Sequence, residues 1–395
     1  MDAILTLNAG SSSVKFGVFR AASDPAPVAE GLVESIGTAP QARLKDAQGA
    51  VPFQGPVPAD YAADHAGSLA FVLSQLGAQF GAMQIRAVGH RVVHGGADFD
   101  APRVITPDVL SQIKALIPFA PLHQPHNIAG IDAATATFTQ AVQVACFDTA
   151  FHRGHEFAHE AFAIPRAYYD KGIRRYGFHG LSYDYIAGHL ANAYPDLHRG
   201  RVVVAHLGNG ASLCALRGGR SVASTMGFTA LDGVAMGTRP GQIDPGVLLY
   251  LMQQEGLSAP QISDLLYRQS GLLGLSGISA DMRDLLSSDA PEAAQAVTYF
   301  CARIAREIAA LAADMGGIDA LVFTGGIGEN AAPIRAQICA SLDWLGLALQ
   351  PEQNNGAPGL ISPTGAARPV LAIPTNEELI IARAASRLIG DPEGA

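Results

Sequence analysis

The sequence has few charged residues, few cysteines and no long apolar run. Charged residues make up 15% of the 395 positions and hydrophobic residues 49%, which excludes a disordered chain and is enough for a large core. No stretch approaches the roughly 18 consecutive apolar residues of a membrane span. Asp2 stands where a secretory signal needs a basic residue, so no signal peptide is expected.

Clusters of basic residues are also scarce. The net charge is −9, and only the pair Arg174 and Arg175 stands out, so the basic stripe of a nucleic-acid-binding protein is absent from the sequence. The four cysteines are far apart and form no CxxC pair, which predicts free thiols in a reducing compartment; they are Cys146, Cys214, Cys301 and Cys339. These features predict a cytoplasmic protein.

Short apolar runs rich in β-branched residues alternate with longer helical patterns, which predicts an α/β fold. The predicted strands are residues 3–8, 14–20, 87–93, 142–147, 201–207, 212–216, 320–324 and 369–373. The predicted helices are residues 107–117, 182–194, 244–255, 279–286, 291–315, 333–341 and 376–388. Ser182 and Ser279 are expected N-caps, and Gly316 with Gly317 is expected to end the longest helix. Residues 21–29 and 351–369 read as surface loops.

One pattern occurs twice. Residues 7–12 read LNAGSS and residues 207–212 read LGNGAS, and in both places a polar turn follows a predicted strand and precedes another. Two strand–turn–strand units about 200 residues apart favour a duplicated domain, although Gly-rich turns also resemble one another by chance.

Three Gly-rich turns are candidate phosphate or nucleotide sites. In NAGSSS (residues 8–13, followed by Lys15) and HLGNGAS (206–212), glycine allows successive N–H groups to face one concavity, although a plain hairpin turn has the same composition. In TGGIGEN (324–330), Gly326 and Gly328 would let a flat nucleoside approach the backbone at a helix start. Neither a Walker A loop nor GxGxxG is present, so a P-loop or Rossmann site is not favoured.

Four charged or titratable side chains are candidate functional residues. Arg91 in GHRVVHGG and Arg239 in MGTRPG fit a bidentate clamp on a carboxylate or phosphate, and a structural ion pair is the alternative. Asp148 in FDTAFH and His179 in YGFHG would each be structural if they stood alone.

Residues 155–159 read HEFAH, which matches the HExxH pattern of zinc proteases. Gly154 precedes the segment and Pro165 follows it, so any helix there is short, and no third ligand follows. The match is interpreted as coincidental.

These segments together resemble the acetate kinase family, within the larger group of sugar kinases, Hsp70 and actin. The matching stretches run from residue 8 to residue 379; they include NAGSSSVK, GHRVVHGG, PLHQPHN, FDTAFH, RYGFHG, HLGNGAS, MGTRPGQIDPG, FTGGIGEN and PTNEEL. The resemblance implies two duplicated α/β domains of mixed sheet flanked by helices, of ribonuclease H-like type, around a nucleotide cleft. It places an N-terminal domain at 1–148 with a returning C-terminal helix at 379–395, and a nucleotide-binding domain at 149–378.

The family's reaction is reversible, direct in-line transfer of the ATP γ-phosphoryl group to a short carboxylate. By resemblance, Arg91 holds the carboxylate, Arg239 stabilises the transferring group and His179 donates a hydrogen bond to it. Asp148 is expected to orient Arg91, since a carboxylate substrate is already ionised at pH 7 and needs no general base. All three of Arg91, His179 and Arg239 are expected to serve one reacting centre.

The resemblance also implies the remaining ligands. Mg²⁺ (or Mn²⁺) would be held near Asn8 and Glu377, and His123 would support the site. The expected ATP-binding residues are Lys15, His206, Leu207, Gly208, Asn209, Gly210, Asp281, Met282, Arg283, Gly326, Ile327, Gly328, Glu329 and Asn330. Members of the family are usually homodimers.

The sequence departs from the family pattern at several positions. FHGTSH is here FHGLSY, PLHNPPN is PLHQPHN and RSGDIDP is RPGQIDP, which affects residues around the charged groups. MGFTPLEG is here MGFTALDG, so Ala230 replaces a proline that, with residues matching Val93, Leu122 and Phe178, would surround the acetate methyl group. The opened space predicts that propionate is used nearly as well as acetate.

Other functions stay open at this stage. A propionate or butyrate kinase has the same motifs. A pyrophosphate donor is less favoured because GGIGEN is intact, and a nucleotide-driven binding module like actin would need neither Arg91 nor Arg239.

Overall fold

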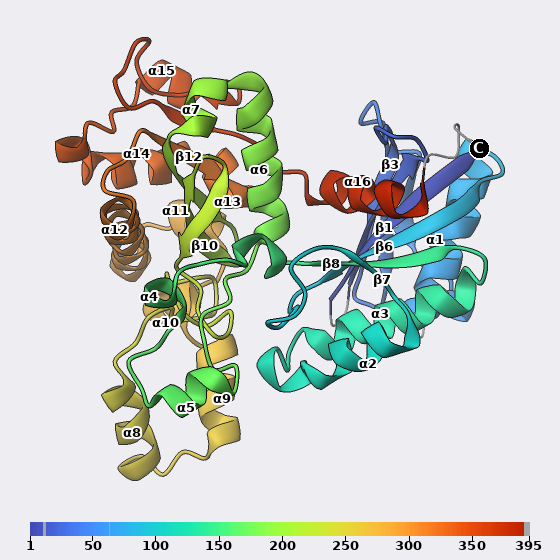
Figure 1. Cartoon of the computed structure of the whole chain (residues 1–395), viewed down its shortest axis with the longest axis horizontal. Helices are drawn as coiled ribbons and strands as arrows, with labels where there is room; N and C mark the ends of the chain where they lie inside the picture. Colours follow the sequence, from blue (N-terminus) through green and yellow to red (C-terminus); the bar gives the residue numbers. More distant parts are fainter. Residues whose placement is uncertain (11–12, 63, 391–395) are drawn as a thin grey trace. The chain divides into compact units, whose positions relative to one another are not determined.

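The computed structural model describes residues 1–10, 13–62 and 64–390, which divide into two compact units (Figure 1). Unit 1 contains Met1–Phe151 and the chain from Asn376 onward, and unit 2 contains His152–Thr375. Ser11 and Ser12 of the first Gly-rich turn, and residues 391–395 of the expected C-terminal segment, lie outside the described residues. Within the described part of the chain, every helix is too short or too polar to cross a membrane.

Unit 1 is built on an eight-stranded sheet with the order β5-β4-β3-β2-β1-β6-β8-β7. Strands β1, β6 and β8 are parallel, and the others pair antiparallel. The strand bounds are β1 Asp2–Ala9, β2 Val14–Arg20, β3 Pro27–Glu34, β4 Gln41–Asp46, β5 Phe53–Pro56, β6 Gln84–Val92, β7 Arg103–Val104 and β8 Val142–Phe147.

Helices cover both faces of this sheet. The helix bounds are α1 His65–Phe80, α2 Pro107–Ala115, α3 Gln124–Thr137 and α16 Glu377–Ile389. Helices α1 and α3 pack together, and buried side chains of β1 and β2, among them Leu5, Leu7 and Phe16, form one core with residues of α1. The C-terminal helix α16 packs on β1, β6 and β8 (red in Figure 1), so central strands are buried on both sides.

Unit 2 has a six-stranded sheet with the order β11-β10-β9-β12-β14-β13, in which β9, β12 and β14 are parallel. The strand bounds are β9 Arg201–Leu207, β10 Ala211–Arg217, β11 Arg220–Ser224, β12 Ala320–Thr324, β13 Gly359–Leu360 and β14 Val370–Ala372. The helix bounds are α4 Phe157–Glu160, α5 Arg166–Asp170, α6 Gly180–Ala193, α7 Pro195–Arg199, α8 Pro245–Gln253, α9 Ala259–Arg268, α10 Gly271–Ser276, α11 Met282–Leu286, α12 Pro291–Asp314, α13 Gly325–Asn330, α14 Ala332–Ala340 and α15 Pro351–Asn354.

The two sheets share one topology, as the repeated turn pattern predicted. In each unit a three-stranded antiparallel meander (β1–β3, or β9–β11) is extended through its first strand by two parallel strands, β6 and β8 or β12 and β14. The first two strands form a hairpin in both units: Ala9 pairs with Val14 in unit 1, and Leu207 pairs with Ala211 in unit 2. The mixed α/β class with two helix-flanked sheets is confirmed.

Several local predictions were wrong. Ser182 lies inside α6, whose N-cap is His179, and the N-cap of α11 is Asp281 instead of Ser279. Strand β3 begins inside the segment 21–29, and α15 and β13 lie inside 351–369, so neither segment is only a loop. The longest helix ends at Asp314, before the two glycines, as predicted.

The contact between β6 and α16 leads to a test. A β-carbon on Gly89 of β6 would lie 2.3 Å from Cγ2 of Ile381, so we expect Gly89→Ala to destabilise unit 1 by about 1–3 kcal/mol. Urea unfolding checks this value. The control is Gly77→Ala in α1, where no atom lies within 4 Å, and which should leave stability unchanged or raised by up to about 1 kcal/mol. Equal stability of both variants would contradict the proposed packing.

Candidate active site

Arg91 and Asp148 form a two-point ion pair at one edge of the unit 1 sheet. Arg91 is the penultimate residue of β6, and Asp148 follows β8 directly, so the carboxyl ends of two parallel strands bring them together. Arg91 Nε donates to Asp148 Oδ1 at 2.9 Å and Nη2 donates to Oδ2 at 2.6 Å. Asp148 is 1% exposed, so its carboxylate is fixed and in turn fixes the plane of the guanidinium.

The start of α3 holds the chain that follows Arg91. Asn127 accepts from the Val93 N–H at 3.0 Å and donates to the carbonyl of Ala9 at the end of β1. Gln124 accepts from the N–H of His94 and donates to its carbonyl. The PLHQPHN motif therefore acts on the backbone around Val93; His123 is the N-cap of α3, and Leu122 precedes it, half-buried.

Two carboxylates of α16 lie beside basic residues of unit 1. Glu377 Oε2 is 3.8 Å from Arg91 Nη1, and Glu378 Oε1 is 2.6 Å from Lys15 Nζ. Burial raises the pKa of Glu377, and Asp148 and Glu378 add to this shift against the opposing effect of Arg91. Burial disfavours the charge of Lys15, but Glu378 and other carboxylates outweigh it and raise the Lys15 pKa. Acidic and basic groups are thus concentrated beside Arg91.

His179 occupies an unusual backbone position in unit 2. It is the N-cap of α6 with φ of 57° and ψ of 25°, in the left-handed region that non-glycine residues rarely adopt. Its ring stacks on His206, with centroids 4.3 Å apart, and its Nδ1 is 2.9 Å from Ser212 Oγ on β10. A residue held in a left-handed conformation by its neighbours is a candidate functional residue.

The β9–β10 turn brings His179 and Arg239 to one place. A β-carbon on Gly210 would lie 2.8 Å from Arg239 Nη2 and 3.4 Å from His179 Nε2. Both side chains therefore approach the turn backbone at a residue that has no side chain of its own. Arg239 Nη1 also donates to the Ala230 carbonyl at 2.8 Å. Arg91 belongs to unit 1, where it lies with Asp148 and Glu377.

A cavity of about 730 Å³ begins at the same turn and is large enough for a nucleoside. Eight of the residues expected to bind ATP line it: Gly208, Asn209, Asp281, Met282, Arg283, Gly326, Ile327 and Asn330. Ala280, Leu286, Ala331 and Pro333 line it as well and had not been predicted.

Other predicted ATP-binding residues lie elsewhere. Gly328 is buried, and the Glu329 carboxylate turns inward to accept the N–H groups of Gly325 and Thr375. Leu207 is fully buried at the end of β9, and His206 Nδ1 is 2.8 Å from Ser182 Oγ. These residues therefore shape the turns without lining the cavity.

The segment that carries Ala230 is tied to the segment before His179. Arg175 Nη1 donates to Asp232 Oδ2 at 2.8 Å, and the Tyr176 N–H donates to the Gly227 carbonyl at 3.0 Å. A β-carbon on Gly227 would lie 2.5 Å from the Asp232 carboxylate, so the segment is closely folded. The RYGFHG and MGFTALDG motifs are thus packed directly against each other.

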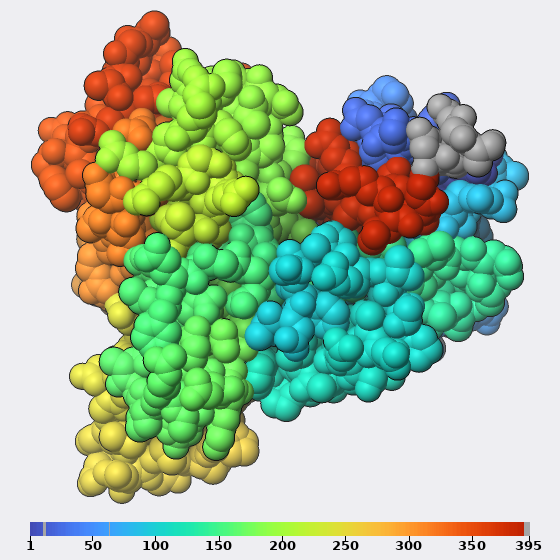
Figure 2. All heavy atoms as spheres, in the orientation of Figure 1, coloured from blue at the N-terminus to red at the C-terminus, as the bar shows by residue number. Residues whose placement is uncertain are grey.

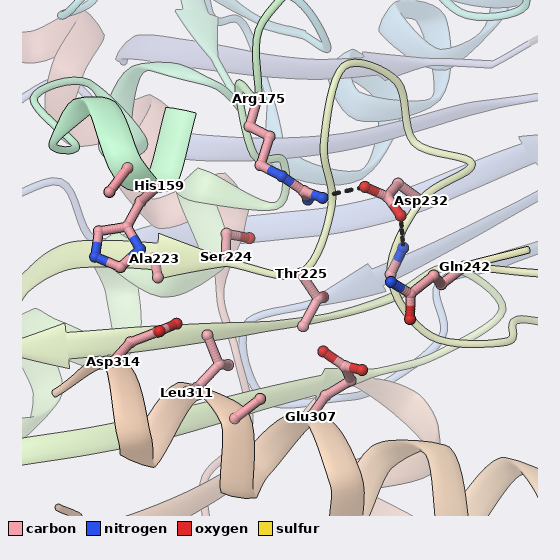
Figure 3. Close-up of a pocket in the computed structure, with 13 residues that line it drawn as sticks. His159, Arg175, Ala223, Ser224, Thr225, Asp232, Gln242, Glu307, Leu311 and Asp314 are labelled. Atoms are coloured by element: carbon pink, nitrogen blue, oxygen red, sulfur yellow. Dashed lines mark hydrogen bonds and ion pairs between the residues drawn. The ribbon is translucent and has the colours of Figure 1, made fainter. Parts of the chain in front are cut away.

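The HExxH segment does not form a metal-binding helix. Helix α4 begins at Phe157, so His155 lies before it and binds Ser221 Oγ at 2.7 Å, while burial and neighbouring positive groups lower the His155 pKa to about 3. His159 instead lines a separate hollow of about 260 Å³ with Arg175 and Asp232 (Figure 3). His155 and His159 therefore lie in different environments.

The chain is similar to known proteins over nearly its whole length. The acetokinase family model matches residues 3–383. The chain is 50% identical over 391 residues to an acetate kinase of Methylocella silvestris, covering 96% of each protein. It resembles the crystal structure of Porphyromonas gingivalis acetate kinase (36% identity, TM-score 0.88, 99% of this chain and 100% of that one). It also resembles a propionate kinase of Francisella tularensis (37% identity, TM-score 0.89, 97% and 99% covered).

Proposed function

The chain belongs to the acetokinase family, and on this premise we propose that it transfers the γ-phosphoryl group of ATP to acetate, forming acetyl phosphate and ADP. One observation carries the proposal. The β9–β10 turn lines a nucleoside-sized cavity with Gly208 and Asn209, and at Gly210 it meets Arg239 and His179. A nucleotide bound in the cavity with its phosphates toward Gly210 would have two donors suited to phosphoryl oxygens beside them.

The residues of unit 1 would bind the acceptor. Asp148 uses both oxygens on Nε and Nη2 of Arg91, so the Nη1 edge, which lies 3.8 Å from Glu377 Oε2, would donate to a carboxylate substrate. Acetate is ionised at pH 7, so it needs no general base, and the bidentate contact supports an orienting role for Asp148. Arg239 would hold the transferring group and His179 would donate to its oxygens, in a direct in-line transfer.

Asn8 and Glu377 are proposed to hold Mg²⁺, or Mn²⁺. Mg²⁺ keeps most of its water and binds few protein oxygens, so one amide and one carboxylate are ligands of the expected kind. Glu377 lies near two further carboxylates, Asp148 and Glu378, whose negative charge a cation would offset. When bound, the ion supplies charge that neutralises phosphate oxygens, and Lys15 would add to it.

A trapping assay tests the function. With ATP, Mg²⁺, acetate and hydroxylamine, the protein should form acetohydroxamate, and chelation of the metal should abolish the product. Arg239→Gln should lower the rate by about 10²–10³, because it removes a donor that acts on the transferring group. The control is Arg199→Gln, an exposed arginine paired with Asp196. ATP hydrolysis without hydroxamate would instead indicate a nucleotide-driven binding module.

Acyl-chain selectivity depends in this proposal on Ala230. Val93 and Phe178 are buried and Leu122 is half-buried, and all three would contact the acyl group together with Ala230. Because alanine leaves more space than proline, kcat/KM for propionate should lie within tenfold of that for acetate, one buried CH₂ being worth about 0.8 kcal/mol. Ala230→Val, which fills the space without fixing the backbone, should lower the propionate value more than the acetate value. Initial rates with acetate, propionate and butyrate test this prediction. A kcat/KM for propionate more than tenfold below that for acetate refutes it.

We also propose that the protein is a homodimer, with helix α8 in the interface. Its sequence is PGVLLYLMQ and none of its residues is buried; Leu249 and Tyr250 are each 54% exposed and Met252 is 50% exposed. Helices α8 and α9 (yellow) form one end of unit 2 in Figures 1 and 2. An apolar helix left this open in one chain is typical of a surface that a second copy covers.

Sedimentation velocity tests the dimer. The protein should sediment with twice the 41.0 kDa mass of the chain, and Leu249→Glu should shift it to one chain because a charge would be buried in the contact. Gln253→Glu, at the end of the same helix, adds the same charge outside the apolar stretch and should leave the mass unchanged. A single-chain mass for the unchanged protein would exclude the interface.

A further inference from the structure

A hydrogen-bonded chain of three side chains ends on His179. Ser212 Oγ lies 2.9 Å from His179 Nδ1 and 2.6 Å from Tyr183 Oη. Ser212 and Tyr183 are both fully buried. Tyr183 lies one helical turn after His179 on α6, where its N–H donates to the His179 carbonyl, and Ser212 faces both from β10.

We propose that Tyr183 is a positioning residue that acts through Ser212 to keep the proton of neutral His179 on Nε2. This inference rests on the proposed function, because it matters only if His179 donates from Nε2 to the transferring phosphoryl group. The protein departs from the common FHGTSH pattern at this residue: Tyr183 occupies the place of the second histidine.

The direction of these two hydrogen bonds follows from which group is the better proton donor. A phenol is a stronger acid than an aliphatic alcohol, so the Tyr183 hydroxyl is the better donor and Ser212 Oγ accepts from it. The single Ser212 proton then goes to the lone pair of His179 Nδ1. A neutral imidazole that accepts at Nδ1 carries its proton on Nε2.

The surroundings of Nε2 favour the same tautomer. Nε2 is the ring nitrogen nearest Gly210, where a β-carbon would lie 3.4 Å from it and 2.8 Å from Arg239 Nη2. If the proton were on Nδ1 instead, Nε2 would present a lone pair to anionic phosphoryl oxygens. A proton on Nε2 instead makes it a second donor beside Arg239.

Tyrosine also differs from histidine in its ordinary pKa. The ordinary pKa of a phenol is about 10, whereas a histidine at position 183 would change charge near pH 6.5. Titratable and charged groups around these three side chains include His206 stacked on His179, His152 with its ring 5.5 Å from Tyr183, Arg239 at Gly210, and Asp184 exposed on α6.

Nuclear magnetic resonance of the ring nitrogens tests the tautomer directly. In the full-length protein labelled with ¹⁵N-histidine, the His179 resonances are identified by their loss in His179→Gln. We expect Nδ1 without a proton and Nε2 with one, in the absence of any substrate. Tyr183→Phe should give a mixture of the two tautomers, and Ser212→Ala should remove the preference. A proton on Nδ1 in the unchanged protein overturns the proposal.

Kinetics provide the second readout. In Tyr183→Phe, neutral His179 spends time with its proton on Nδ1, while the protonated ring still donates from Nε2. The kcat should therefore fall by about three- to tenfold as pH rises from 6 to 8, with KM for ATP and acetate unchanged, whereas the unchanged protein shows no such fall. Tyr185→Phe is the matched control, because Tyr185 lies on the same helix and contacts His189 instead.

The two readouts separate this inference from the proposed function. If no hydroxamate forms but the tautomer is as expected, the function is wrong and the chain of hydrogen bonds stands. If hydroxamate forms and Tyr183→Phe has the pH profile and the tautomer of the unchanged protein, the positioning role of Tyr183 is wrong.

Discussion

The position of the Arg239 guanidinium beside the β9–β10 turn depends on the absence of a side chain at Gly210, because a β-carbon there would lie 2.8 Å from Nη2. The turn has to serve two purposes at once. On one side its backbone borders the nucleoside-sized cavity, and on the other it receives Arg239 and His179. Any side chain would push the guanidinium away from the turn, so the close approach and the chemistry require the same glycine.

The duplicated topology explains why chemical groups gather at comparable places in both units. A hairpin turn follows the first strand of each sheet, and the parallel strands added beside it end at the same edge. In unit 1 this edge carries Asn8, Arg91 and Asp148; in unit 2 it carries the β9–β10 turn and the start of α13. Carboxyl ends of parallel strands are common ligand sites since side chains from separate segments converge there without strain.

The sequence predicted the parts whose physical cause is local. Strands β8, β9 and β12 are mostly buried and rich in apolar and β-branched residues, and their bounds were predicted residue for residue. Strands β3 to β5 were missed because Pro, Gly and charged residues interrupt them, and α3 because its polar residues bind backbone and its glycine packs on Ala9. The contact of Tyr183 with Ser212 had no local cause either, since it depends on how α6 lies against β10. Motif resemblance found His179 but could not find what holds it.

Charge balance in unit 1 accounts for the sparse set of candidate metal ligands. Three carboxylates, Asp148, Glu377 and Glu378, face two basic side chains, Arg91 and Lys15. Burial raises the pKa of Glu377, and the two neighbouring carboxylates add to this shift. Acetate and ATP are both anions, so they would meet repulsion at this edge of the sheet. A divalent cation held here, as proposed, would reverse the sign of the local charge and would need few protein oxygens to do so.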